Sequence, residues 1–246
     1  MSSSVQRKRI RKSPEARRAE IVDSAAAVAL AEGLECLTLR RIADELDVRP
    51  GLISHYFPSV EDLVAEAFGT AAGAELEVLL PTGPAASPDS DASPGPDAST
   101  GPNASTGLDA STGLDARTGP DAPTPTDRLA RFFARTSGEA YDAISRLWIN
   151  ARHLSRYRPV LRDRVAEQEA AWRGRLEGVI EEGVARGEFR TDEPYVTAIQ
   201  ILVVLDGLGV HANTDDRGRP EAVTRMAVTT AERELGLPRG ALARDA

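Results

Sequence analysis

Residues 38–57 read TLRRIADELDVRPGLISHYF, and this stretch decides the fold of the N-terminal part of the chain. Thr38 suits the N-cap of a short helix, and Pro50 suits the start of a second one after a turn of about three residues. The apolar positions fit the inner side of such a unit, namely Ile42, Ala43, Leu46, Val48 and Ile53. The pattern predicts a helix-turn-helix, whose second helix can enter the major groove of DNA.

The segments on either side of this stretch also read as helices. Residues 14–33 form a predicted helix, because Ser13 is a favoured N-cap and Pro14 suits the first helical position. Ser59 is the expected cap of a further helix, over 59–80, which leads away from the helix-turn-helix.

The net charge of −8 is unevenly distributed along the chain. Residues 1–65 carry as many basic as acidic side chains, and the first 18 residues are strongly basic. The basic side chains of the N-terminal arm are Arg7, Lys8, Arg9, Arg11 and Lys12. Such an arm suits phosphate binding, because Arg and Lys displace condensed counterions from DNA. The alternative is a solvated tail that binds nothing.

A repeat interrupts the chain after the first helices. From Gly95 it reads GPDAST, GPNAST, GLDAST, GLDART and GPDAPT, within a stretch over 81–126 rich in Pro, Gly, Ser, Thr, Ala and Asp. Only Leu108 and Leu114 are sizeable apolar residues there, too few to offset the entropy of ordering, so we expect a disordered insert. The alternative is a hexapeptide β-helix, which needs an aliphatic residue at a fixed position of each rung.

The remainder of the chain also has helical periodicity. Predicted helices cover 138–156, 159–186 and 220–235, and two more are expected to be capped by Thr126 and Asp192. No strand pattern competes with these segments. The sequence therefore predicts an all-α protein.

Composition excludes several classes of protein. The longest apolar stretch is interrupted by polar residues before it reaches about 20 residues, and the basic N-terminus lacks the apolar core of a secretory signal. Cys36 is the single cysteine, so we expect no disulfide and interpret it as a small core residue, with redox sensing as the alternative. His55, His153 and His211 lack metal-ligand spacing. We expect a cytoplasmic protein that is not an enzyme, has no metal or cofactor and does not bind membranes.

Several motifs together resemble the tetracycline-repressor (TetR-like) family of transcriptional regulators. They are Gly33, Thr38-Leu39, Ile42-Ala43, Val48, Gly51, Tyr56-Phe57 and the SVEDL of residues 59–63. The string GLISHYF, with Leu205-Asp206-Gly207-Leu208, is similar to the branch that contains repressors of choline–betaine pathways. The resemblance implies that three N-terminal helices bind DNA, that the other helices enclose a small-molecule pocket, and that the last two pack against a partner subunit.

The resemblance also implies roles for individual residues of the helix-turn-helix. It places Thr38 and Arg40 against phosphates, and Tyr56 against the DNA backbone. Its recognition helix consists of Arg49, Pro50, Gly51, Ser54 and His55.

Three positions depart from the family pattern. Asp47 stands where glycine is usual, and Asp tolerates the left-handed conformation better than most residues. Arg49 replaces the usual Ser or Thr cap, and Val60 replaces a common phosphate-binding lysine. We therefore expect the phosphate contact at Val60 to be absent and the basic arm to offset it.

Polar residues on apolar helical stripes indicate an effector site, because ligand pockets are mostly apolar with a few convergent polar groups. The candidates are Trp148, Asn150, Gln168, Trp172 and Asp206. For Asp206 the alternative is a structural ion pair with an arginine, because an unpaired buried carboxylate is costly. Arg152 and His153 project away from the stripe, and we expect both to be solvated.

The helix after Asp192 is apolar on nearly all sides and must be covered on all of them. Together with the helix at 220–235 it predicts a two-fold, four-helix interface of a homodimer. The predicted parts of the chain are a basic disordered arm (1–12), a helix-turn-helix domain (13–58), a connecting helix (59–80), the insert (81–126), an effector-binding and dimerisation domain (127–237) and a tail (238–246).

These observations predict a DNA-binding transcriptional regulator. The expected mechanism is that of a repressor that releases a palindromic double-stranded operator when a small molecule binds the C-terminal domain. The alternative is a helical small-molecule-binding or structural bundle without operator-specific DNA binding.

Overall fold

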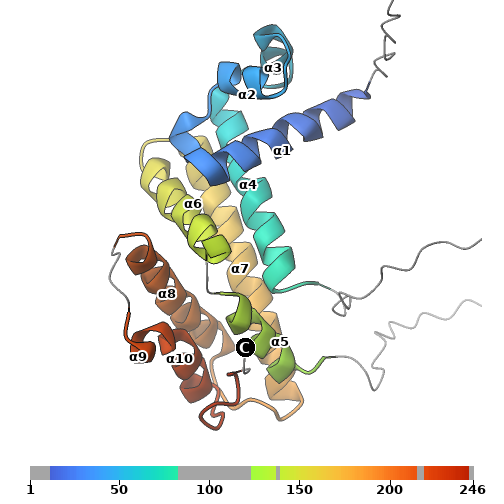
Figure 1. Ribbon diagram of the computed structural model, residues 1–246. Coiled ribbons are helices and arrows are strands. Elements are labelled where there is room, and N and C mark those ends of the chain that lie inside the picture. Colours follow the sequence, from blue (N-terminus) through green and yellow to red (C-terminus); the bar gives the residue numbers. More distant parts are fainter. Residues whose placement is uncertain (1–11, 83–122, 137–138, 215–218, 244–246) are drawn as a thin grey trace, which may run out of the picture.

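The computed structural model describes residues 12–82, 123–136, 139–214 and 219–243. These residues form helices and connections without a strand, which confirms the all-α prediction for the part described (Figure 1). The helices are α1 (Pro14–Glu32), the 3-10 helix η1 (Leu34–Cys36), α2 (Leu39–Glu45), α3 (Pro50–Tyr56), α4 (Val60–Leu79), α5 (Pro125–Arg135), α6 (Glu139–Ser155), α7 (Pro159–Ala185), α8 (Pro194–Ala212), α9 (Glu221–Thr224) and α10 (Met226–Glu234). Arg7, Lys8, Arg9, Arg11 and the hexapeptide repeats as far as residue 122 lie outside the described residues.

Local capping explains where the N-terminal helices begin. Ser13, Thr38 and Ser59 each accept a hydrogen bond from a backbone N–H in the first turn of their helix, at 3.0 to 3.2 Å. All three caps confirm the sequence prediction. The interpretation of Cys36 as a small core residue is wrong. The 3-10 turn directs its neighbours Leu34 and Leu37 into the core and leaves Cys36 exposed.

Two long helices connect the ends of the molecule. α4 packs against α1 at one end and against α7 along its length, and α6 and α8 both pack on α7 (Figure 1). The shared core includes Phe68 and Leu76 of α4, and Leu161 and Leu176 of α7, all of them buried. The helix-turn-helix lies at one end of these helices, and α8 and α10 lie toward the other.

The predicted cap of the first helix after the insert is wrong by two residues. α5 begins at Pro125, and Thr124 is its N-cap. The Thr124 hydroxyl accepts from the Asp127 N–H at 3.1 Å, and the Asp127 carboxylate accepts from the Thr124 N–H at 3.3 Å, which is a capping box. Thr126 instead donates its hydroxyl to Glu188 at 2.8 Å.

The starts of the C-terminal helices also differ from the prediction. α8 begins at Pro194, because proline suits the first helical position, and Asp192 is therefore not its cap. The predicted helix over 220–235 is divided into α9 and α10 at Arg225, whose backbone departs from helical geometry with φ −88° and ψ 5°.

The chain after α10 folds back on that helix. The buried carboxylate of Glu232 accepts hydrogen bonds from the backbone N–H groups of Gly240 and Leu242, at 2.9 and 3.0 Å. Leu242 is itself buried. Residues 238–243 of the predicted tail (238–246) are thus attached to the C-terminal helices.

A tight turn ends α7. Gly187, at φ +73°, reverses the chain and brings Phe189 back against α7. A Cβ added at Gly183 would lie 2.0 Å from the Phe189 ring, so the ring occupies the space that a side chain at this position would need.

Among the described helices, α8 is the one long and apolar enough to cross a membrane by length and composition. It packs against α6, α7 and α10, as a core helix of a helical bundle also does. Its apolar character is therefore explained in part by packing within the chain.

Candidate functional site

The helix-turn-helix has the geometry that its sequence predicts. α2 and α3 pack through Ile42, Ala43 and Ile53, whose side chains are fully buried. Asp47 adopts φ +50° in the turn, which confirms the expected left-handed conformation, and the Val48 N–H closes the turn on the Ala43 carbonyl at 2.9 Å. The two helices are thus held in a fixed relation at one end of the molecule.

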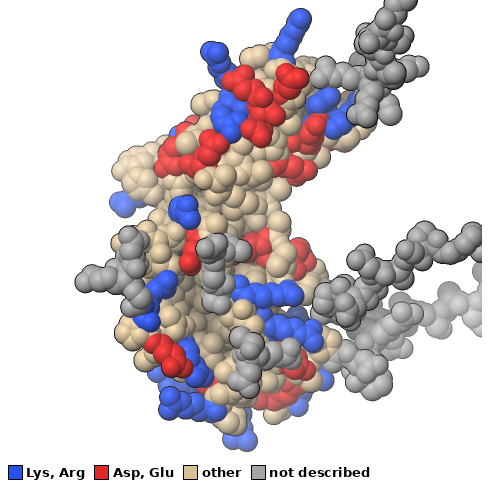
Figure 2. Space-filling model, viewed as in Figure 1, with Lys and Arg blue, Asp and Glu red and all other residues tan. Residues whose placement is uncertain are grey.

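Most residues predicted to contact DNA lie on the outer surface of this unit. Thr38, Arg40, Arg49, Pro50, Gly51, Ser54 and His55 are exposed, and Tyr56 is partly buried. Figure 2 shows basic side chains projecting from this end of the molecule. No atom lies within 4 Å of a Cβ placed at Gly51, so another molecule can approach the backbone closely there.

Arg40 and Arg41 are adjacent but have different surroundings. The side chain of Arg40 is 86% exposed, and its nearest acid is Asp44 at 3.9 Å. Arg41 forms ion pairs of 2.6 Å with both Glu32 and Glu45, and these hydrogen bonds raise its pKa. Arg40 is therefore available to a phosphate, whereas Arg41 joins α1 to α2.

Two further basic residues of this unit differ in their surroundings. Arg49 precedes α3 without making a side-chain cap, as its departure from Ser or Thr predicts. Lys12, the last residue of the basic arm, forms an ion pair with Glu20 at 2.7 Å.

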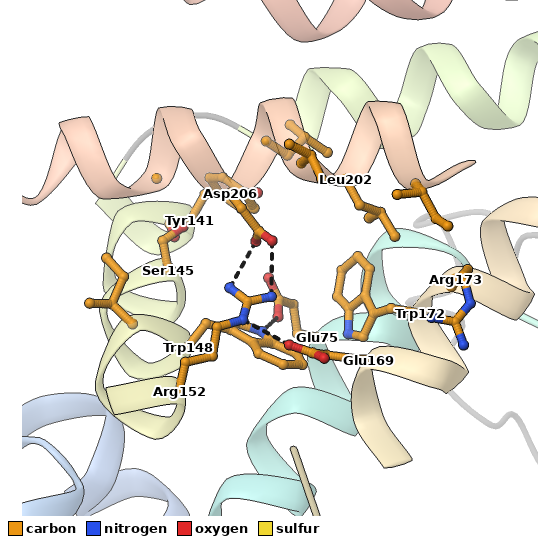
Figure 3. A pocket seen from close by; sticks show the side chains of 15 residues that line it. Glu75, Tyr141, Ser145, Trp148, Arg152, Glu169, Trp172, Arg173, Leu202 and Asp206 are labelled. Atoms are coloured by element: carbon orange, nitrogen blue, oxygen red, sulfur yellow. Dashed lines mark hydrogen bonds and ion pairs between the residues drawn. The ribbon is translucent and has the colours of Figure 1, made fainter. Parts of the chain in front are cut away.

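A cavity of about 240 Å³ lies between α4, α6, α7 and α8 (Figure 3). Its wall combines aromatic, aliphatic and charged side chains. The lining residues are Glu75, Tyr141, Ser145, Trp148, Ile149, Arg152, Glu169, Trp172, Arg173, Ile199, Leu202, Val203, Leu205, Asp206 and Gly209. Trp148, Trp172 and Asp206, three of the five predicted effector residues, are thus brought together.

Arg152 joins three walls of this cavity. Its guanidinium donates to Glu169 of α7 at 2.9 Å and to Asp206 of α8 at 3.0 Å, and it lies 5.0 Å from the ring centre of Trp148 (Figure 3). The expectation that Arg152 projects away from the stripe as a solvated side chain is wrong, because α8 brings Asp206 to this face of α6 and the guanidinium lies half-buried in the cavity wall. His153 is exposed, as predicted.

Asp206 thus has the structural partner that the alternative interpretation required. Its side chain is 48% exposed and that of Arg152 is 36% exposed, so solvent reaches the pair. Loss of hydration raises the pKa of Asp206, an effect that the Arg152 charge opposes.

Glu75 is a cavity residue that sequence reasoning missed. It lies on α4, and its carboxylate accepts a hydrogen bond from the indole N–H of Trp148 at 3.0 Å. Removal from water raises the pKa of Glu75 to about 7; the Trp148 N–H opposes this effect, and the Asp206 carboxylate adds to it. No local pattern in α4 marks this residue, because the burial comes from three other helices.

The two tryptophans form an aromatic wall. Their ring centres are 6.5 Å apart with an interplanar angle of 84°, and Trp148 also packs edge-on against Phe68. The indole N–H of Trp172 is buried and has no hydrogen-bond partner within the described part of the chain.

The structure places the other two predicted effector residues outside the cavity. Asn150 contacts η1, where its side-chain oxygen accepts a hydrogen bond from the Leu34 N–H at 2.8 Å. Gln168 is directed toward α4, and its side-chain oxygen lies 3.8 Å from a Cβ placed at Gly73.

Comparison with known families agrees with both halves of this architecture. Residues 21–67 match the family described as bacterial regulatory proteins, tetR family, and residues 125–236 match the BetI-type transcriptional repressor, C-terminal. The chain belongs to the TetR family. The first match spans the helix-turn-helix, and the second spans three of the four helices that form the cavity.

Solved structures of other regulators share this fold. A TetR-family regulator from Rhodococcus sp. has a TM-score of 0.62 at 18% identity, over 89% of this chain and 98% of the other. A TetR-family regulator from Cytophaga hutchinsonii has a TM-score of 0.62 at 17% identity, over 92% and 97%. A transcriptional regulator from Saccharomonospora viridis in complex with choline has a TM-score of 0.61 at 18% identity, over 89% and 97%. The search of curated protein sequences gave no match.

The TetR-family assignment explains the overall arrangement. It identifies the helix-turn-helix of α2 and α3 as the DNA-binding unit, and the C-terminal helices as the effector-binding domain.

Proposed function

We propose that this TetR-family regulator is a cytoplasmic, homodimeric repressor that releases a palindromic operator when a small molecule enters the cavity between α4, α6, α7 and α8. One observation supports this most directly: α4 and α6 line the cavity and also pack against α1 of the DNA-binding unit. A ligand that shifts either helix therefore acts on the position of the helix-turn-helix.

The proposed DNA contacts follow the exposed surface of α2 and α3. Thr38, Arg40 and Tyr56 bind the backbone, and the recognition-helix residues Arg49, Pro50, Gly51, Ser54 and His55 face the bases. The basic arm, from Arg7 to Lys12, adds phosphate contacts that do not depend on base sequence.

The proposed dimer uses an exposed apolar stripe on α8. Val196, Val203 and Val210 follow one another at helical spacing and are 37%, 62% and 44% exposed, and Met226 of α10 is 45% exposed. Val203 also lines the cavity, so this stripe borders it. A C₂ axis beside this stripe would cover it with the same stripe of a second copy. Two recognition helices related by that axis require a palindromic site.

The proposed effector site keeps Trp148, Trp172 and Asp206 and gains Glu75 and Arg152. The cavity volume suits a compact organic molecule. Choline, which is bound to the regulator from Saccharomonospora viridis, is the first ligand to test.

The decisive experiment selects DNA from a random pool by gel shift and then titrates candidate effectors against the recovered site. We expect a palindrome with half-sites about 34–36 Å apart or at a close multiple of that distance. A recovered pool without two-fold symmetry would contradict the proposal.

The dimer is tested separately by Val210→Asp, which places a charge on the α8 stripe outside the cavity lining. We expect a monomer in light scattering and a loss of operator affinity of at least tenfold. Val78→Asp is the matched control, because Val78 is 58% exposed on α4. A Val210→Asp protein that stays dimeric would exclude this face as the interface.

A further inference from the structure

The charges that face the cavity are unequally matched. Arg152 of α6 forms hydrogen-bonded ion pairs with Glu169 of α7 and Asp206 of α8. Arg173 of α7 lies 5.3 Å from the ring centre of Tyr195. Glu75 of α4 is different. Its hydrogen bond comes from an uncharged indole, and it forms no ion pair with any residue in the described part of the chain.

The ionised form of a carboxylate is unfavourable in free energy in such surroundings. Burial removes its hydration, and an ion pair is the usual compensation inside a protein. The ionisable neighbours do not supply one: Asp206 repels a charge on Glu75, Tyr141 is neutral because burial raises its pKa, and Arg152 is engaged by two other acids. These surroundings therefore keep Glu75 partly protonated near neutral pH.

The aromatic wall beside Glu75 suits a cation, which is the partner that the Glu75 carboxylate lacks. The indole N–H of Trp148 donates to the Glu75 carboxylate, and the ring of Trp172 lies at 84° to the ring of Trp148. Aromatic faces attract cations, and cages of aromatic rings recognise alkylated ammonium groups. One face of Trp148 already carries the guanidinium of Arg152, which demonstrates that this wall accepts a cation.

We infer that Glu75 is the counter-ion of a positively charged effector, and that it exchanges its proton for the ammonium group of that ligand on binding. This inference rests on the proposed function, since it assumes that the cavity is the effector site. The exchange is balanced: the neutral carboxylic acid releases one proton to solvent, the ligand cation enters, and the resulting carboxylate pairs with it without any covalent change.

The exchange has a defined pH dependence. At low pH the cation must displace a proton, whereas at high pH the carboxylate is already ionised, so affinity for a permanent cation rises with pH. For a group that titrates near pH 7, the affinity increases about tenfold between pH 6 and pH 8. An uncharged ligand of the same shape shows no such increase.

The test compares choline with its uncharged isostere 3,3-dimethylbutan-1-ol by titration calorimetry on the full chain. Measurements at pH 6 and pH 8, in buffers of different ionisation enthalpy, give both affinity and the number of protons released. We expect wild type to prefer choline at pH 8 by at least tenfold, and to release a substantial fraction of one proton at pH 6.

Glu75→Gln should bind choline and the isostere within about twofold of each other and lose the pH dependence. Glu77→Gln is the matched control, because Glu77 is on the same helix, outside the cavity, and pairs with Arg175. Its binding should equal that of wild type.

Three results would overturn the inference: a Glu75→Gln protein that keeps the preference for choline, a wild type that binds choline without proton release, or a wild type that binds neither choline nor tetramethylammonium at ~10 mM. The proton count needs no variant, so it remains decisive if Glu75→Gln fails to fold. Operator release by a neutral or anionic molecule would overturn this inference and leave the proposed function intact.

Discussion

The side-chain oxygen of Asn150 accepts a hydrogen bond from the backbone N–H of Leu34 at 2.8 Å, which joins α6 directly to the 3-10 turn between α1 and α2. The amide of Asn150 also donates to the carboxylate of Glu35. Trp148 and Arg152, two positions before and after Asn150, line the cavity. One helix therefore lines the cavity and also contacts the DNA-binding unit.

Replacing Asn150 should weaken communication between the sites without weakening ligand binding. Asn150→Ala removes the bond to Leu34, and a residue along such a connection typically changes coupling by about 0.5–2 kcal/mol, or about 2-fold to 30-fold. We expect effector affinity within about twofold of wild type and a smaller effect of effector on operator affinity. Fluorescence anisotropy with labelled operator measures both. His153→Ala, on the exposed side of α6, is the control; an equal loss of coupling there would argue against a specific role for Asn150.

The stability of the empty protein should depend on pH through Glu75. Its folded-state pKa of about 7 lies above the usual 4.5, so the native state binds the proton more tightly and loses stability as pH rises from about 4.5 through 7. Glu75→Gln removes this loss. We expect the variant to be more stable than wild type by about 1–3 kcal/mol at pH 8 and nearly equal at pH 4.5, measured by urea unfolding. A variant less stable at pH 8 would show that the charged form is compensated in the native state.

Two kinds of change should separate affinity from sequence preference in the DNA-binding surface. Tyr56→Phe and Thr38→Ala should weaken binding to all DNA sequences, whereas Arg49→Ala and Ser54→Ala should change which sequences are preferred. Thr38→Ala also removes the N-cap of α2 and should cost about 1 kcal/mol of stability. Binding to a library of operator variants distinguishes the two classes, and a uniform loss for Arg49→Ala would assign that residue to the backbone.

The contact between Gly183 and Phe189 should make one glycine of α7 irreplaceable. Gly183→Ala places a methyl group 2.0 Å from the Phe189 ring, and the ring must move; overpacking of this kind costs about 1–3 kcal/mol. Gly178→Ala, in the same helix with no atom within 4 Å, should be neutral or stabilise by up to about 1 kcal/mol. Thermal unfolding of both variants compares them, and equal melting temperatures would exclude the predicted clash.

The helix-turn-helix could be predicted from sequence because its determinants are local. Thr38 caps the helix that it begins, and Asp47 meets a backbone requirement of its own turn. Thr124 was missed in favour of Thr126 because both are good caps, and Pro125 at the first helical position is the signal that separates them.

The cavity could be predicted only in part, because it depends on how four helices pack. Trp148 and Trp172 are found from their place on apolar stripes. Arg152 was assigned to solvent because a helical wheel considers one partner helix, whereas a third helix brings Asp206 to it. Glu75 has no signal of its own, since its burial is produced by residues far away in the sequence.

The guanidinium above Trp148 also bears on how sensitive the regulator is. Arg152 is tethered to the cavity wall, and a tethered group competes at an effective concentration that is typically in the millimolar range or above. A cationic ligand that packs on the same face of Trp148 must displace the Arg152 guanidinium, whose local concentration does not fall when the protein is diluted. We therefore expect a high response threshold: the regulator would ignore traces of its effector and respond when the compound accumulates.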